Sequence, residues 1–139
     1  MDNQLEKLLL LIRCLGNEMS FLIFKYNDGY YEEDKSDDSY LTMLSEVFDE
    51  GSYWTNAIRH ALQNPISEGA TGNKTDVTIK GDKVIIEPLF AENPQEYAIE
   101  IDRQVLFDLI NKWQELVAKK CQEITFTRHE DGSITLSGK

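Results

Sequence analysis

One long helix near the carboxyl end dominates the pattern of this sequence. Asp102 precedes it and Lys119 and Lys120 close it, as expected for a capped amino end and a negative carboxyl end of a helix. Its apolar residues recur at helical spacing: Val105, Leu106, Leu109, Ile110, Trp113, Leu116 and Val117. Because so wide an apolar face must be covered, we expect this helix to lie on a β-sheet.

Strand patterns surround that helix. Apolar residues alternate with polar ones on both sides of the Gly81-Asp82 turn, again from residue 97 to 101, and on both sides of the turn at residues 130–132. The alternating residues are Val77, Ile79, Val84, Ile86, Tyr97, Ile99, Ile101, Ile124, Phe126, Ile134 and Leu136. This pattern predicts two hairpins and a single strand between them.

The first half of the chain is predicted to be mainly helical. Residues 2–15 carry Leu5, Leu8, Leu9, Ile12 and Leu15 on one face, which Leu10, Leu11 and Cys14 widen. A second helix around residues 40–48 begins at Asp38 or Ser39, and a third around residues 52–62 ends at Asn64-Pro65. The continuous apolar run at residues 19–24 fits either a buried strand or a helical turn, and we favour the strand.

Together these elements predict an α+β fold in one domain, residues 1–139. We expect N-terminal helices in a helical part of about residues 1–65. A strand-rich part of about residues 75–139 would form an antiparallel sheet of about five strands with one long helix packed on it.

The charge balance narrows the choice of partner. With 14 basic against 25 acidic residues, the formal net charge is −11, which repels nucleic-acid phosphates and anionic membranes. A basic protein partner fits such a surface, although acidity can also serve solubility alone. Acidic residues near the start and an apolar run of only Leu8–Ile12 argue against a signal peptide or a membrane span, so we expect a cytoplasmic protein.

Motifs for catalysis, cofactors and metals do not stand out. The glycines form no phosphate-binding loop, and Cys14, Cys121, His60 and His129 lack the spacing of a zinc site. We therefore expect no cofactor, no metal and no enzymatic activity. Asp28, Asp34, Asp37 and Asp38 lack the ligand order of a calcium-binding EF-hand, and a glycosidase-like carboxylate pair would need a rigid cleft rather than a charged loop.

A loop at residues 27–38 is the candidate partner-binding surface, together with the turn at residues 49–54. Both combine acidic residues with aromatic ones, as protein interfaces often do. The candidate residues are Asp28, Tyr30, Tyr31, Glu32, Glu33, Asp34, Asp37, Asp38, Asp49, Glu50 and Tyr53. We assign Trp54 and Tyr40 to the core because they lie on periodic helix faces.

The carboxyl-terminal segment EIDRQVLFDLINKWQEL, followed by EITFTRHEDGSITL, with the acidic composition, resembles immunity proteins of bacterial polymorphic-toxin and contact-dependent growth inhibition systems. The resemblance implies a protein that neutralises a cognate toxin, commonly a nuclease, by covering its active site or an essential surface. The alternative is a homo-oligomeric adaptor or chaperone-like module whose first helix, with Leu10 and Leu11, forms a homodimer interface.

Overall fold

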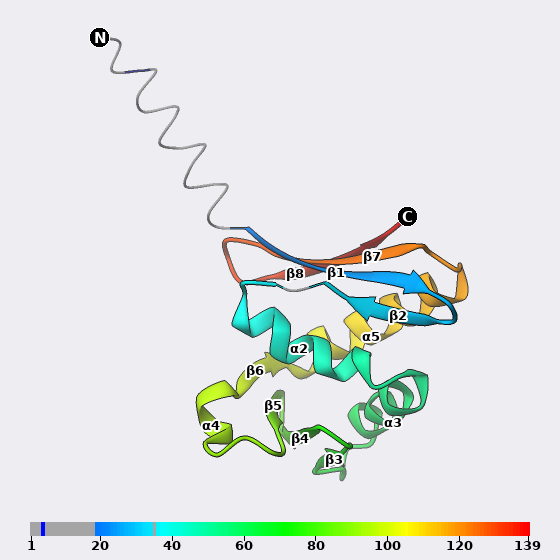
Figure 1. The fold of residues 1–139 in the computed structure, drawn as a ribbon. Coiled ribbons are helices and arrows are strands. Elements are labelled where there is room, and N and C mark those ends of the chain that lie inside the picture. Colours follow the sequence, from blue (N-terminus) through cyan, green and yellow to red (C-terminus); the bar gives the residue numbers. More distant parts are fainter. Residues whose placement is uncertain (1–3, 5–18, 35) are drawn as a thin grey trace.

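The computed structural model describes residue 4, residues 19–34 and residues 36–139. Its architecture is a layer of helices between two antiparallel sheets (Figure 1). The helix expected at residues 2–15, its homodimer interface and Cys14 lie outside the described residues apart from Gln4.

Within the described residues, the strands form two four-stranded sheets. Sheet A has the order β2-β1-β7-β8 and comprises β1 (Ser20–Asn27), β2 (Tyr30–Glu33), β7 (Glu123–Arg128) and β8 (Ile134–Gly138). Sheet B has the order β3-β4-β5-β6 and comprises β3 (Gly69–Thr71), β4 (Thr75–Lys80), β5 (Lys83–Pro88) and β6 (Ile99–Asp102). All pairings in both sheets are antiparallel.

The α+β character predicted from the sequence is present, but the predicted arrangement is wrong. The chain does not place its helices first and then build one five-stranded sheet. Residues 20–33 form a hairpin that pairs with β7 from the far end of the chain, so the strands divide between two sheets. Alternation shows which face of a strand is buried, but it does not show which strand lies beside it.

Three helices of the middle layer match the periodic patterns. They are α2 (Ser39–Asp49), α3 (Ser52–Gln63) and α5 (Arg103–Ala118). Asp38 caps α2 and Asp102 caps α5, each accepting two backbone N–H groups with its side chain. Capping and apolar spacing thus suffice to predict α2 and α5, whereas α3, whose N-cap residue Gly51 makes no side-chain hydrogen bond, is predicted by apolar spacing.

The strand expected at residues 97–101 is shorter than its alternation suggests. Residues Pro94–Tyr97 form the one-turn helix α4, and β6 begins only at Ile99. Pro94 occupies the first turn of that helix, where its missing N–H needs no partner. Tyr97 consequently lies outside the sheet and is 58 % exposed.

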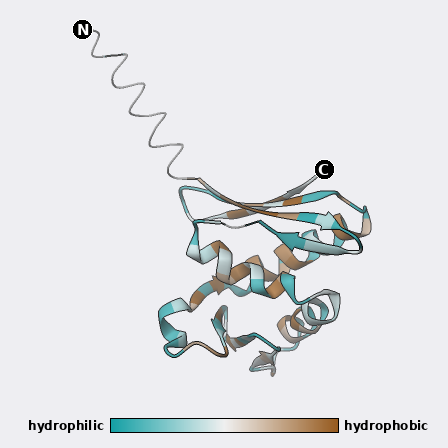
Figure 2. Cartoon of the chain, in the orientation of Figure 1, coloured by the Kyte–Doolittle hydropathy of each residue, from teal (hydrophilic) through white to brown (hydrophobic). Residues whose placement is uncertain are grey.

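The core fills both spaces between the sheets and the helical layer. Figure 2 shows apolar stretches along α2 and α5, between the two sheets. Sheet A turns Leu22, Phe24, Ile124, Phe126 and Leu136 inward, and sheet B turns Val77, Ile79, Val84, Ile86, Ile99 and Ile101 inward. These side chains and the buried faces of α2, α3 and α5 belong to one hydrophobic cluster.

Candidate functional site

Part of the segment expected to be an exposed acidic loop, residues 30–33, is an edge strand, β2. Asp28 and Gly29 form the tight turn of the β1–β2 hairpin, both with positive φ. After this turn Tyr30 is 73 % exposed, whereas the Tyr31 hydroxyl donates a hydrogen bond to the Cys121 carbonyl oxygen at 2.6 Å. Of these two tyrosines, only Tyr30 offers its ring to a partner.

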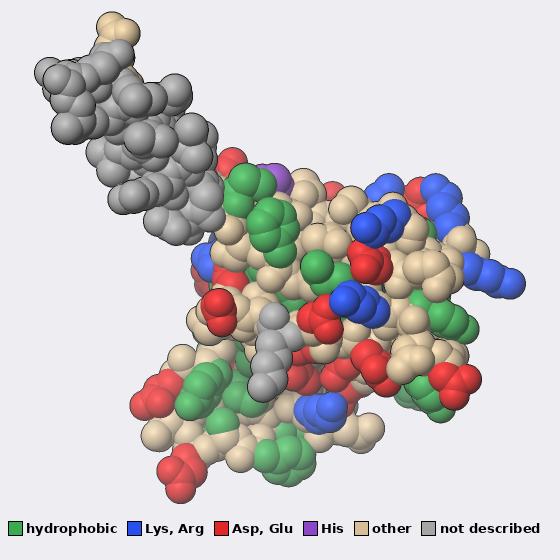
Figure 3. Space-filling view, turned by 45° about the horizontal axis from the view of Figure 1, so that its top comes forward, with side chains coloured by type: hydrophobic (Ala, Val, Ile, Leu, Met, Phe, Trp, Pro, Cys, Tyr) green, Lys and Arg blue, Asp and Glu red, His purple; other side chains and the backbone are tan. Residues whose placement is uncertain are grey.

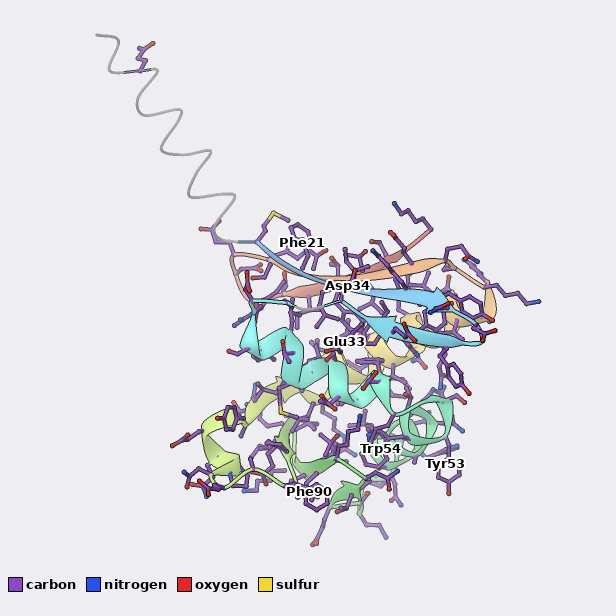
Figure 4. All side chains as sticks on the ribbon, viewed as in Figure 1. Phe21, Glu33, Asp34, Tyr53, Trp54 and Phe90 are labelled. Carbon is purple, nitrogen blue, oxygen red and sulfur yellow. The ribbon has the colours of Figure 1, made fainter. Side chains whose placement is uncertain are left out.

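Strand alternation sends the neighbouring acids to opposite faces of sheet A. Glu32 lies beside Lys25 in the β1–β2 register, and the Asp34 carboxylate is 3.0 Å from the Lys25 ammonium group. Glu33 pairs with Phe24, whose side chain is buried, so Glu33 faces the helical layer. Figure 4 shows Glu33 where β2 approaches α2.

Asp38 was predicted both as a possible helix cap and as a partner-binding residue, and the structure shows it as the cap of α2. Its Oδ1 accepts hydrogen bonds from the N–H groups of Tyr40 and Leu41 and lies 3.2 Å from Nη1 of Arg128. Burial alone would raise the pKa of Asp38, but hydrogen bonds from Ser20, Leu41 and Arg128 hold that pKa below its ordinary value. Asp38 therefore serves the start of α2, whereas Asp37 is exposed.

Glu33 meets three further carboxylates from the carboxyl end of α2. We call Glu33, Glu46, Asp49 and Glu50 the acidic cluster. Lys74, in the β3–β4 turn, is its nearby cation: its ammonium group is 3.5 Å from Asp49 Oδ2, and its backbone N–H donates to Glu50 Oε1 at 2.8 Å. Figure 3 shows acidic side chains gathered on this face of the molecule.

Three oxygens of the acidic cluster are buried without compensation. Oε2 of Glu33, of Glu46 and of Glu50 find no hydrogen-bond partner in the described part of the chain. An unpaired buried polar atom costs stability, and a charged one costs more. The acidic cluster thus has fewer hydrogen-bond donors than its buried oxygens could accept from.

The pKa values of two glutamates in the acidic cluster also show that their negative charge is poorly compensated. Burial raises the pKa of Glu33 and the charge of Asp49 raises it further, while a hydrogen bond from Ser45 and the charge of Lys74 lower it without cancelling the increase. Burial likewise raises the pKa of Glu46, with Asp49, Glu33 and Glu50 adding to the effect against Lys74. One lysine does not balance four carboxylates.

The position of these acids on α2 adds to the cost. Glu46, Asp49 and Glu50 are spaced i, i+3 and i+4, so their like charges repel one another on one helix face. They also lie in the last turn and at the C-cap, where the helix dipole disfavours negative charge. Because this arrangement of charges lowers the stability of the fold, we consider the acidic cluster a candidate binding site.

An apolar groove lies next to the acidic cluster and shares Glu46 and Lys74 with it. We call it the α2–α4 groove; it has a volume of about 840 Å³. Most of its lining comes from α2 and the residues just before it, and from the chain between the end of β5 and the start of β6; Lys74 and Arg128 complete it. The lining residues are Ser36, Asp37, Ser39, Tyr40, Thr42, Met43, Glu46, Lys74, Pro88, Phe90, Ala91, Glu96, Tyr97, Ala98, Ile99 and Arg128.

The structure therefore divides the residues predicted from the sequence. It brings Glu33, Asp49 and Glu50 together and places Tyr53, 89 % exposed, at the start of α3 beyond them. Asp28, Tyr30, Glu32 and Asp34 lie along the hairpin, away from the cluster's buried oxygens. The core assignment of Trp54 is confirmed, since it is 8 % exposed.

Sequence reasoning missed Glu46 and Lys74. The spacing of Glu46 from Asp49 and Glu50 was a usable signal, because three acids at i, i+3 and i+4 near a helix end repel one another. Lys74 left no such signal, since only the fold brings the β3–β4 turn to the end of α2.

Comparison of the chain with protein-family models, with curated proteins and with solved structures yields no match. In the parts of the chain that the structure describes, no group of three or more His, Cys, Asp or Glu side chains is arranged to hold a metal ion. None of the described helices combines the length and the apolar character that crossing a membrane requires.

Proposed function

We propose that this chain is a non-catalytic inhibitor that binds a basic protein partner through the acidic cluster. An arginine or lysine side chain of the partner binds beside α2 at the half-buried carboxylates of the acidic cluster, where it offsets the negative charge that Lys74 leaves unbalanced. Arginine suits the site best, because its planar guanidinium can donate to two carboxylates at once.

The observation that carries this proposal is the gathering of four half-buried carboxylates around one lysine, three of them with an oxygen that no donor among the described residues reaches. Binding a cation there reduces the repulsion among the carboxylates and offsets the free-energy cost of burying their charge. The exposed Tyr53, at the start of α3 just after Glu50, supplies an aromatic contact beside the cluster.

The biological role that fits is that of a cytoplasmic bacterial immunity protein whose cognate toxin is a nuclease. A nuclease is basic around the cleft that holds phosphates, so an acidic cluster can cover that cleft. In this role the chain binds neither nucleic acid nor membrane and needs no cofactor.

The test is a binding and protection assay with a toxin domain encoded beside this chain. The double variant Glu46→Gln with Asp49→Asn removes two charges from the acidic cluster without changing side-chain size. We expect affinity for the toxin domain to fall about thirtyfold or more, since removing one side of a buried charge pair costs about 2–5 kcal/mol. Cells expressing the toxin should lose protection, and added salt should weaken wild-type binding.

The matched control is Glu100→Gln with Glu130→Gln, which removes the same charge from exposed positions on β6 and in the β7–β8 turn. This control should bind and protect like the wild type. If the acidic-cluster variant also binds like the wild type, the partner does not use the cluster. If the chain protects against no toxin domain encoded beside it, the immunity role is wrong.

A further inference from the structure

The α2–α4 groove leaves large apolar side chains uncovered. Phe90 is 85 % exposed and Tyr97 is 58 % exposed at its rim, while the buried Met43 and Ile99 contribute to its lining. Figure 4 shows Phe90 standing at the surface, on the side of sheet B. A patch of this kind marks a surface that another apolar segment covers.

The described body of the chain begins at one end of this groove. Ser20 pairs with Arg128 in the β1–β7 register, and the Ser36 hydroxyl donates to the Phe21 carbonyl oxygen at 2.9 Å. Ser36 and Arg128 both line the groove. Figure 1 shows the start of β1 on the same side of the molecule as α4 and the amino end of α2.

The sequence that precedes β1 has the pattern of a groove-binding helix. Leu5, Leu8, Leu9 and Ile12 are spaced i, i+3, i+4 and i+7, the anchor spacing with which an amphipathic helix fills an apolar groove. Lys7 and Arg13 bracket the leucine run, and the groove lining contains three acids, Asp37, Glu46 and Glu96, beside two cations, Lys74 and Arg128. The apolar spacing therefore carries the match, and the groove offers acids to the two cations of the segment.

We propose that residues 5–15 of the same chain dock in the α2–α4 groove as a helix. A helix of this length is about 16 Å long. Residues 16–19, with Gly16 first, span up to about 14 Å when extended, enough to turn the chain back across one helix diameter of about 10 Å. Docking within one chain is favoured over a second copy because the segment starts at the groove itself.

A spin label on Cys14 tests this in the full chain. The Cys121→Ala variant leaves Cys14 as the single thiol, and a nitroxide attached there broadens the NMR signals of nearby backbone amides. We expect the amide signals of Met43, Phe90 and Tyr97 to lose most of their intensity relative to the reduced label. The amide of Tyr53, at the start of α3, should keep its intensity.

Two further samples make the result decisive. Leu8→Asp with Leu9→Asp in the labelled chain should restore the groove signals, because charged residues cannot enter the apolar groove. A mixture of spin-labelled chain with isotope-labelled, nitroxide-free chain should show no broadening. Unchanged groove signals in the first sample would overturn the proposal, and broadening in the mixture would assign the segment to a second copy instead.

Discussion

At the residue scale, Trp113 joins the layers of the molecule. Its indole ring lies 4.9 Å from the Phe24 ring and 5.9 Å from the Phe126 ring of sheet A, and 5.1 Å from the Phe48 ring of α2, measured between centroids. Tyr31 adds an edge contact at 5.5 Å. These contacts make Trp113, 5 % exposed, the point at which α5, α2 and sheet A meet.

We expect Trp113→Ala to lower the free energy of unfolding by about 3–5 kcal/mol, since it leaves a cavity among four aromatic rings. Urea denaturation followed by far-UV circular dichroism measures the loss. Val105→Ala on the same helix is the control: Val105 is 40 % exposed, despite its place in the apolar pattern, and should lose much less. Wild-type stability of Trp113→Ala would contradict this account of the core.

Glu46 links stability to pH. Because folding raises the pKa of Glu46 above its ordinary value of 4.5, the folded state favours the protonated form. The contribution of this group to stability is therefore complete below pH 4.5 and is lost as pH rises through the raised pKa. Glu33 has the same sign.

Glu46→Gln keeps the neutral form at every pH. We expect this variant to be more stable than the wild type at pH 7, and the difference to shrink as pH falls toward 4.5. Thermal melts across pH 4–8 measure it, with the exposed Glu130→Gln as a control for which we expect no gain. A stability difference that does not change with pH would show that ionisation of Glu46 costs the fold nothing.

At the element scale, α2 carries favourable charge at its start and unfavourable charge at its end. Asp38 accepts hydrogen bonds from two free N–H groups at the amino end, where the helix dipole also favours an anion. Asp49 and Glu50 stand at the opposite end, where the same dipole disfavours them. One helix thus combines a stabilising cap at its start with acidic residues that cost stability at its end.

We expect Asp38→Ala to destabilise the protein by about 1–2 kcal/mol through loss of the N-cap. Asp38→Asn should lose less, because an amide oxygen still caps the helix while the charge that pairs with Arg128 is gone. Urea midpoints measure both variants. The neighbouring Asp37→Ala, at an exposed position, is the control, and an equal loss there would rule out capping as the cause.

At the scale of the whole molecule, the two ends of the described fold are tied together. Sheet A combines β1 and β2 with β7 and β8, about a hundred residues later in the chain. The helices α2 and α5 bury side chains against both sheets in one hydrophobic cluster. If either sheet separated from the helices, buried side chains of the shared hydrophobic cluster would be exposed to water.

We therefore expect both sheets to open in one cooperative step. Hydrogen exchange measured by NMR should give the same free energy of opening for the protected amides of β7 in sheet A and of β5 in sheet B. Trp113→Ala should lower both values equally, although Trp113 stacks against rings of sheet A. Unequal values for the two sheets in the wild type, or a loss in Trp113→Ala confined to sheet A, would show two units that unfold separately.

Local pattern accounts for the elements predicted correctly from the sequence. The helix α5 and its Asp102 cap, the cap and apolar face of α2, the apolar face of α3, and the β4–β5 and β7–β8 hairpins all depend on residues within one helix or one turn of each other. The strand favoured for residues 19–24 is confirmed as β1. The binding surface was predicted from its acidic and aromatic composition. Composition does not show that Glu32 points outward and Glu33 points toward the helices.

The sequence by itself determined most of the helices and strands and which of their faces are buried, because hydrophobic periodicity and capping act over a few residues. It did not determine β2, which falls in the predicted loop, or α4, which takes Tyr97 out of the predicted strand. Only the tertiary structure decided that β1 pairs with β7, and that the strands form two sheets rather than one. It also decided that Glu33 meets Glu46, Asp49, Glu50 and Lys74. Strand pairing and charge clustering join residues far apart in the chain, and alternation along one strand carries no information about its neighbour.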